Sequence, residues 1–249
     1  MKKTILAAFN QGTIPTISIA NRAITPLGAE FKKLVAALQT YADQHFTPVW
    51  GTPCRLVVSP DGKIPKGNWG FLFLDDADAA DALGYHDLTS DGMPLSKVFV
   101  RTTVDNGEKV SVTAAHELAE MLVDPGIQLG ALDPKGVWYA YETADAVERE
   151  TFDVGGIAMS NFVYPSWFEA FHKAGSVKFD HLGSCKKPFE IRPGGYMPVF
   201  KNGKWSQIFG SKAMAKGFEP ADHPRTSRRC ASDGTRPAKK KMSAASTGC

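Results

Sequence analysis

The apolar and polar positions of the chain predict a mixed α+β protein whose strands and helices come in a definite order. From Thr25 to His45 apolar residues recur at helical spacing, and Pro26 near the start is typical of the first turn of a helix, so the segment predicts an amphipathic helix. Short apolar runs bounded by turn residues predict strands at Lys3–Phe9, Thr16–Ile24, Cys54–Ser59, Trp69–Asp76 and Lys97–Thr102. We expect the third and fourth of these strands to be buried, because their apolar runs are continuous.

A second helix is predicted from near Asn106 to just before Pro125, and hairpins dominate the chain beyond it. Proline is a stop signal for a helix because it lacks the backbone N–H. The turn dipeptides Gly155-Gly156 and Asn202-Gly203 predict two hairpins, and Ser166–Ala174 between them is typical of a short helix.

Charge is concentrated at the C-terminal end of the 249 residues. Residues 220–249 hold seven Lys or Arg and two Asp, a net charge of +5, so the remainder carries −2. We expect one folded unit, residues 1–218, with an upstream half (1–125) and a smaller, hairpin-rich C-terminal half (126–218), followed by a disordered basic tail at 219–249. The charge argues against nucleic-acid binding by the folded unit and leaves only weak polyanion contacts to the tail.

The sequence favours a cytoplasmic protein. The apolar run at its N-terminus stops at Asn10, too short for a signal peptide, and no stretch reaches the length of a membrane span. The four cysteines are widely scattered, and this spacing fits neither a disulfide framework nor a CxxC metal site. We therefore expect free thiols in a reducing compartment.

The helix before Pro125 carries the stretch HELAE, which has the residue types of a metal site. His116 and Glu120 are one turn apart and project side by side, so one cation can bind a nitrogen and an oxygen from them. Glu117 lies about 100° around the helix, where a base beside a water molecule belongs. The same residues also fit an ordinary amphipathic helix with a solvated acidic face.

A second acidic segment follows the strand predicted at Val137–Tyr141. A catalytic zinc takes three protein ligands and keeps one position for water, so a further ligand is needed. Glu142 and Asp145 are one turn apart, so one of them can bind the cation while the other accepts the Nδ1 proton of His116. A solvated acidic turn is the alternative interpretation.

These two segments resemble the zincin metallopeptidases, in particular the gluzincin type, in which a glutamate ligand follows the motif helix. HELAEMLVDP and ETADAVE are similar to a group of bacterial and phage proteins with an HExxExxxDP helix and an ExxDxxE turn. The resemblance extends from Thr25 to Phe209. It implies a zincin-like fold, with a mixed sheet, a backing helix and an antiparallel edge strand lining the cleft, here Ser96–Thr102.

The resemblance also implies roles for individual residues. His116, Glu120 and Glu142 would bind zinc. Glu117 would activate water, and Asp145 would support His116 or exchange roles with Glu142. The implied function is a zinc-dependent hydrolase acting on peptides or proteins. The alternative is a zincin-like structural or binding module, such as a phage accessory or virion protein, in which the metal is structural or absent.

Two anionic ligands alter the chemistry of the metal. A His-Glu-Glu set leaves zinc formally neutral, which lowers its Lewis acidity and admits Mn²⁺ or Fe²⁺. His86 and Tyr141 are candidates for oxyanion or substrate contacts, and Met159 for an apolar floor under the metal. A hydrogen-bonded loop histidine and a core methionine are the alternatives for the first and last of these.

Overall fold

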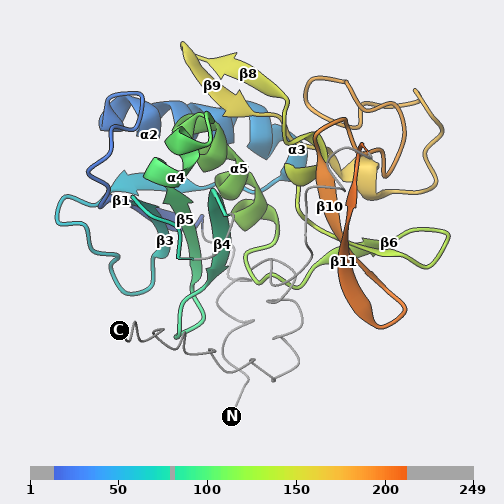
Figure 1. Cartoon of the computed structure of the whole chain (residues 1–249), viewed down its shortest axis with the longest axis horizontal. Helices are drawn as coiled ribbons and strands as arrows, with labels where there is room; N and C mark the ends of the chain where they lie inside the picture. Colours follow the sequence, from blue (N-terminus) through green and yellow to red (C-terminus); the bar gives the residue numbers. More distant parts are fainter. Residues whose placement is uncertain (1–13, 79–81, 212–249) are drawn as a thin grey trace, which may run out of the picture.

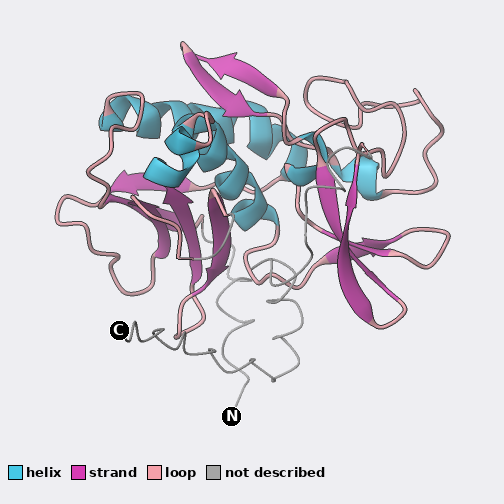
Figure 2. Ribbon diagram, viewed as in Figure 1, coloured by secondary structure: helices cyan, strands magenta, loops and turns pink. Residues whose placement is uncertain are grey.

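The structure of the protein, a computed structural model, describes residues 14–78 and 82–211 and contains mixed α and β structure. Five strands form a mixed sheet, and four others form a separate antiparallel sheet (Figure 1). Figure 2 shows the longer helices gathered over the first sheet, with a two-stranded hairpin above them. The predicted α+β content is confirmed. The strand predicted at Lys3–Phe9 and the predicted basic tail lie outside the described residues.

The five-stranded sheet builds the upstream half. Its strands lie in the order β2 (Arg55–Val58), β1 (Thr16–Asn21), β3 (Trp69–Leu74), β5 (Pro94–Phe99) and β4 (Gly84–Leu88). The first four pair in parallel, and β4 closes the sheet antiparallel to β5. The interior strand β3 is buried as predicted. The edge strand β2 instead alternates between exposed and half-buried residues, so its predicted burial is wrong.

The free edge beside β5 is formed by β4, and the edge strand predicted at Ser96–Thr102 is therefore wrong. β5 lies between β3 and β4, and the chain enters the helix α4 (Val100–Asp105) directly after it. The segment that the sequence pattern favours as a loop, Gly84–Leu88, is the actual edge strand. The chain reverses between β4 and β5 at Gly92, whose φ of 83° is readily adopted by glycine but rarely by other residues.

The first helix, α2 (Phe31–Thr40), begins later than the predicted start at Thr25. Glu30 caps it, because its carboxylate accepts two N–H groups of the first turn. The helix then runs on past His45 as a π-helical segment, η1 (Tyr41–Phe46), and a last turn, α3 (Thr47–Trp50). The apolar face of α2 packs on the sheet, as its periodicity predicts.

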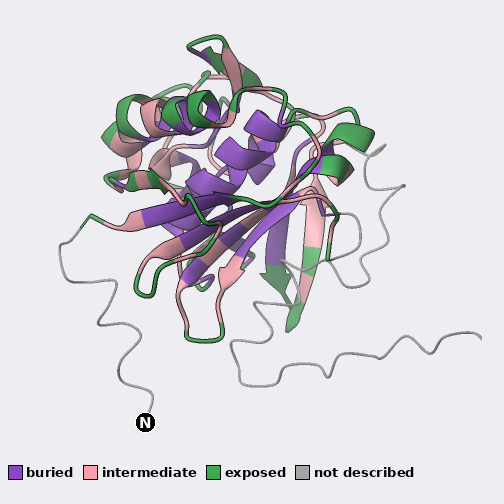
Figure 3. Cartoon of the chain, turned by 90° about the vertical axis from the view of Figure 1, so that its left-hand side faces the viewer, coloured by how far each residue is buried: buried purple, intermediate pink, exposed green. Residues whose placement is uncertain are grey.

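The motif helix, α5 (Val110–Val123), is the most enclosed helix of the fold. Thirteen of its 14 residues are buried, and Figure 3 shows it purple above the sheet. It packs against β4, β5 and the hairpin strand β9 (Ile157–Ser160). It begins after Asn106 because Gly107, at a φ of 74°, separates it from α4. Its end before Pro125 is confirmed.

The downstream half consists of short strands and single helical turns. The antiparallel sheet has the order β11 (Lys204–Phe209), β10 (Tyr196–Lys201), β7 (Trp138–Ala140) and β6 (Gly130–Leu132). Both predicted hairpins are confirmed, the first being β8 (Thr151–Val154) with β9. The acidic segment contains the 3₁₀ turn η2 (Asp145–Val147), whereas the helix predicted at Ser166–Ala174 is reduced to the 3₁₀ turn η3 (Pro165–Phe168).

Two hydrophobic cores meet where the halves join. The first holds α2, α5 and the large sheet, and the second holds η2, η3 and the small sheet. Trp50 and Tyr141 contact both cores, and the Trp50 indole donates a hydrogen bond to the Val163 carbonyl at 3.0 Å. The acidic segment therefore approaches α5 across this junction. Within residues 14–78 and 82–211, the helices fall short of the length and apolar content that a membrane crossing needs.

Candidate metal centre

Three ionisable residues of α5 lie inside the protein rather than on a solvated face. His116, Glu117 and Glu120 are 5%, 1% and 0% exposed. Burying ionised groups is costly unless opposite charges or a metal compensate them. The alternative of a solvated acidic helix face is therefore wrong for α5, and its polar residues need partners within the fold.

His116 contacts carboxylates through both ring nitrogens. Its Nδ1 lies 3.0 Å from Glu148 Oε2, and its Nε2 lies 3.1 Å from both Glu120 Oε1 and Asp145 Oδ1. The expectation that Glu142 or Asp145 accepts the Nδ1 proton is therefore wrong, because Glu148 occupies that position. With Glu148 beside Nδ1, Nε2 still faces two acceptor oxygens, which requires a positive occupant there, either a proton or a cation.

His86 reaches the same cluster from β4. Its Nδ1 lies 3.7 Å from Glu120 Oε2 and 3.9 Å from Glu117 Oε2, and its Nε2 lies 3.8 Å from Glu142 Oε2. The antiparallel register that sets His86 opposite Ser96 turns it toward α5. His86 is thus a buried strand residue of the carboxylate cluster, and the alternative of a hydrogen-bonded loop histidine is wrong.

The carboxylates draw positive charge onto both histidines. Burial lowers the pKa of His116, but the charges of Glu120 and Glu148 outweigh it and hold that pKa well above its usual value. The pKa of His86 is also raised, because Glu142 and the two glutamates of α5 oppose the effect of burial. A metal cation satisfies the same electrostatic demand and displaces these protons.

The cluster contains two sets of residues that can hold a metal ion. In each set the ligand atoms lie within 4.8 Å of one another. The His116 set consists of His116, Glu120 and Asp145, and the His86 set consists of His86, Glu120 and Glu142. Ligand atoms about 2.0–2.2 Å from a shared ion stand some 3–4 Å apart, which fits both sets. The structure thus groups Glu142 with His86 and sets Asp145 beside His116.

Tight backbone packing fixes the acidic segment against α5. The Ala144 N–H donates to Glu120 Oε1 at 3.4 Å. Gly195, directly before β10, packs on η2, and a Cβ there would come within 2.9 Å of the Asp145 carbonyl oxygen. Asp145 therefore owes its position to both α5 and the small sheet.

The end of α5 is tied to the strand that precedes Glu142. Asp124 is fully buried, and its two oxygens accept the N–H groups of Gln128 and Leu129 at 2.9 Å each. The Leu129 carbonyl in turn accepts the Tyr141 N–H at 3.2 Å. The aspartate in the HExxExxxDP pattern thus connects the helix to the acidic segment.

The remaining predicted residues lie in the cores. The Tyr141 ring packs against Phe168, with centroids 4.3 Å apart, and against Trp50. Met159 is buried in the first core on β9. Tyr41, which the sequence pattern did not single out, is fully buried, and burial together with the charge of Glu120 raises its pKa well above the usual value. Helical spacing alone gives no signal for this proximity.

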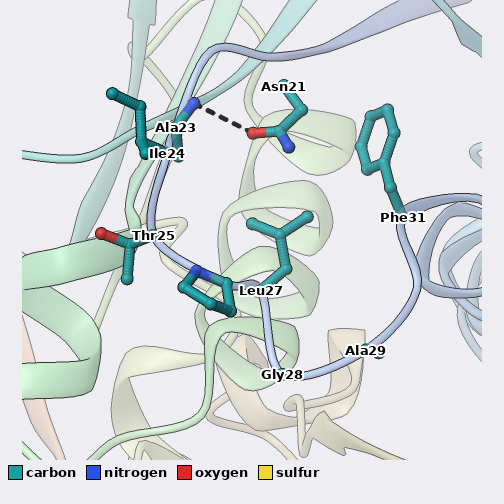
Figure 4. A pocket seen from close by; sticks show the side chains of 9 residues that line it. Asn21, Ala23, Ile24, Thr25, Leu27, Gly28, Ala29 and Phe31 are labelled. Atoms are coloured by element: carbon teal, nitrogen blue, oxygen red, sulfur yellow. Dashed lines mark hydrogen bonds between the residues drawn. The ribbon is translucent and has the colours of Figure 1, made fainter.

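A surface pocket lies apart from the cluster. It has a volume of about 480 Å³ and is lined by the loop from Asn21 to Phe31 between β1 and α2 (Figure 4). Within this loop the Ala23 N–H donates a hydrogen bond to the side-chain oxygen of Asn21. Its lining contains no titratable side chain. We assign the candidate chemistry to the buried cluster, because the residues that can bind a cation or move a proton are there.

No protein-family model matches this chain, and no curated protein or solved structure matches it either. The resemblance to zincins therefore stays a prediction. Function has to be inferred from the residues of the cluster.

Proposed function

We propose that the protein is a metal-dependent hydrolase of the zincin type that cleaves peptide or related amide bonds. The observation that carries the proposal is the position of His116 Nε2, directed at Glu120 and Asp145 with both oxygens 3.1 Å away. Such a nitrogen and two carboxylates make a common ligand set for a divalent metal. Zn²⁺ is the expected ion, with Mn²⁺ or Fe²⁺ as alternatives.

The arrangement of the fold around α5 supports the zincin type. The mixed sheet has an antiparallel edge strand, β4, packed beside the motif helix, and α2 packs on the same core. An acidic segment from the downstream half completes the cluster. These are the elements that the resemblance implies, although the edge strand differs from the predicted one.

The residues of the chain have separate roles in this proposal. His116, Glu120 and one of Asp145 or Glu142 hold the ion, and the short contacts of Asp145 favour it beside His116. When bound, the ion acts as a Lewis acid and lowers the pKa of water. Glu117, one residue along α5, accepts the proton of that water and later donates it to the leaving amine.

Glu117→Gln tests the proposal, because glutamine keeps the shape of the side chain and removes the base. We expect unchanged metal content and a loss of about 10²–10⁴-fold in hydrolysis of a broad peptide library. The matched control is Glu169→Gln, which removes a partly exposed carboxylate paired with His172. Turnover in Glu117→Gln at the wild-type rate contradicts the role of Glu117.

The enclosure of the cluster favours a second candidate function. The residues of both metal sets are buried, and a closed site is typical of a structural metal. In this alternative the protein is a zincin-like structural or binding module, such as a phage accessory or virion component. Wild-type protein that binds metal but cleaves no member of the library supports the module over the enzyme.

A further inference from the structure

Glu120 lies at the centre of the cluster and belongs to both metal sets. Its Oε1 lies 3.1 Å from His116 Nε2, whereas its Oε2 lies 3.7 Å from His86 Nδ1. The two oxygens of one carboxylate therefore face different histidines, His116 on α5 and His86 on β4. A carboxylate in this position can bind two cations at once, one through each oxygen.

His86 gives an independent indication of a ligand on its side of Glu120. It is 2% exposed, and within residues 14–78 and 82–211 neither of its ring nitrogens makes a hydrogen bond. The three carboxylate oxygens around it are 3.7–3.9 Å away, beyond the range of a hydrogen bond. A buried imidazole with this spacing has room for an ion between the ring and the carboxylates.

The charge of the cluster exceeds what one ion compensates. Five carboxylates surround two imidazoles: Glu117, Glu120, Glu142, Asp145 and Glu148. With neutral imidazoles the formal charge is −5, which one divalent ion reduces to −3, or to −2 when the other imidazole holds a proton, and which two ions reduce to −1. Because uncompensated charge is most costly where water is excluded, the count favours two ions over one.

We propose that the cluster is a two-metal centre bridged by Glu120. One divalent ion binds His116, Glu120 and Asp145, and the other binds His86, Glu120 and Glu142. A shared carboxylate holds two ions about 3.5–4 Å apart, the spacing at which both can act on one substrate. The inference rests on the proposed function, because it assumes that the cluster binds a divalent metal.

Glu117 and Glu148 distinguish the two positions. Glu117 lies beside His86, with 3.9 Å between Oε2 and Nδ1, so the proton acceptor lies next to the second position. Glu148 contacts His116 Nδ1 at 3.0 Å and orients that ring for the first ion. The first position is therefore the one with the shorter contacts between its side chains, and the second is the one next to a proton acceptor.

Titration of the metal-free, full-length protein with Mn²⁺ tests the proposal. Mn²⁺ suits oxygen and imidazole ligands and binds cysteine thiols poorly, so the four thiols of the chain interfere little. We expect two ions per chain by equilibrium dialysis and an exchange-coupled spectrum in electron paramagnetic resonance. His86→Ala and His116→Ala should each bind one ion and lose the coupling, whereas His172→Ala, which removes a half-buried histidine outside the cluster, should match the wild type.

The outcomes separate this inference from the proposed function. One ion per wild-type chain, unaffected by His86→Ala, overturns the two-metal centre and leaves a single metal site intact. No bound ion with either Mn²⁺ or Zn²⁺ overturns both. Two ions without magnetic coupling also contradict a bridging Glu120. The wild-type stoichiometry and spectrum decide the matter even where a histidine variant fails to fold.

Discussion

Gly84 and Glu117 pack so closely across the edge of the large sheet that no side chain fits between them. A Cβ on Gly84 would lie 2.9 Å from both Cγ and Oε1 of Glu117, and 2.9 Å from the Lys97 carbonyl oxygen. The edge strand β4 thus determines the position of the proposed base as well as supplying His86. Backbone conformation does not call for a glycine at residue 84, because its φ lies outside the left-handed region. The residue must lack a side chain because Glu117 and the Lys97 carbonyl occupy the space that a Cβ would need.

Gly84→Ala should therefore move Glu117 without changing any ligand of the His116 set. We expect a loss of about 1–3 kcal/mol in the free energy of unfolding from overpacking. Hydrolysis should fall about 10²-fold, since a displacement near 1 Å is enough to misplace a catalytic group. Gly126→Ala is the control, because its nearest neighbour is the flexible end of Gln128 at 3.3 Å. Equal effects of the two substitutions on urea unfolding would contradict the packing argument.

Asp124→Ala should destabilise the connection between α5 and the acidic segment. The substitution removes a fully buried carboxylate and leaves the N–H groups of Gln128 and Leu129, in part-buried hydrogen bonds, without their acceptor, at an expected cost of about 2–4 kcal/mol in urea unfolding. Asp133 provides a matched comparison, since it also accepts two backbone N–H groups but in a partly exposed turn. Asp133→Ala should cost about 1 kcal/mol or less. A smaller loss in the free energy of unfolding for Asp124→Ala than for Asp133→Ala would contradict the proposed role of Asp124.

His181 makes the fold sensitive to mild acid. Its Nε2 lies 3.1 Å from His45 Nδ1, and burial together with the charges of His45 and Lys178 lowers the pKa of His181 to about 4. Between pH 4 and about 6.5 the unfolded chain binds a proton that the folded chain rejects. The free energy of unfolding should therefore fall as the pH drops through this window.

His181→Gln should remove this part of the pH dependence. The free energy of unfolding of the wild type should fall relative to that of the variant by about 1–2 kcal/mol from pH 7 to pH 4, a figure that allows for solvent screening of the half-exposed His181. Urea unfolding at several pH values measures it. Because other groups titrate in both proteins, the quantity to compare is the difference in slope, and parallel curves would contradict the prediction.

Zinc should raise the thermal stability of the wild-type chain. A ligand that binds only the folded state stabilises it by about 2.7 kcal/mol at a free concentration of 100 Kd. For a folded unit of this size that corresponds to a rise of about 5–10 °C in Tm. A chelator should reverse the rise, and Glu120→Gln should show little of it. An equal rise in both proteins would place the bound zinc outside the cluster.

Local sequence patterns predicted the parts of the fold that depend on neighbouring residues. The Asn202-Gly203 turn specifies its hairpin because both positions need positive φ, and they have 51° and 77°. The side-by-side placement of His116 and Glu120 follows from helical periodicity alone. These predictions required no knowledge of which elements meet in space.

The missed parts of the site depend on contacts between distant elements. The edge strand Gly84–Leu88 contains His86 and Asp87, so its sequence favours a loop until β5 is present to pair with it. Glu148 takes the Nδ1 position of His116 because the turn η2 continues far enough to bring it back to α5. Pairing and turn geometry of this kind are set by tertiary packing, which a single sequence does not encode locally.

Metal analysis of the full-length protein tests the central claim, that the carboxylates around Glu120 hold a divalent metal. The protein is supplied with zinc, freed of excess ion and measured by elemental analysis alongside Glu120→Gln. We predict stoichiometric metal in the wild type and a large loss in Glu120→Gln, with both proteins folded. Wild-type protein that stays metal-free after zinc is supplied would contradict the account.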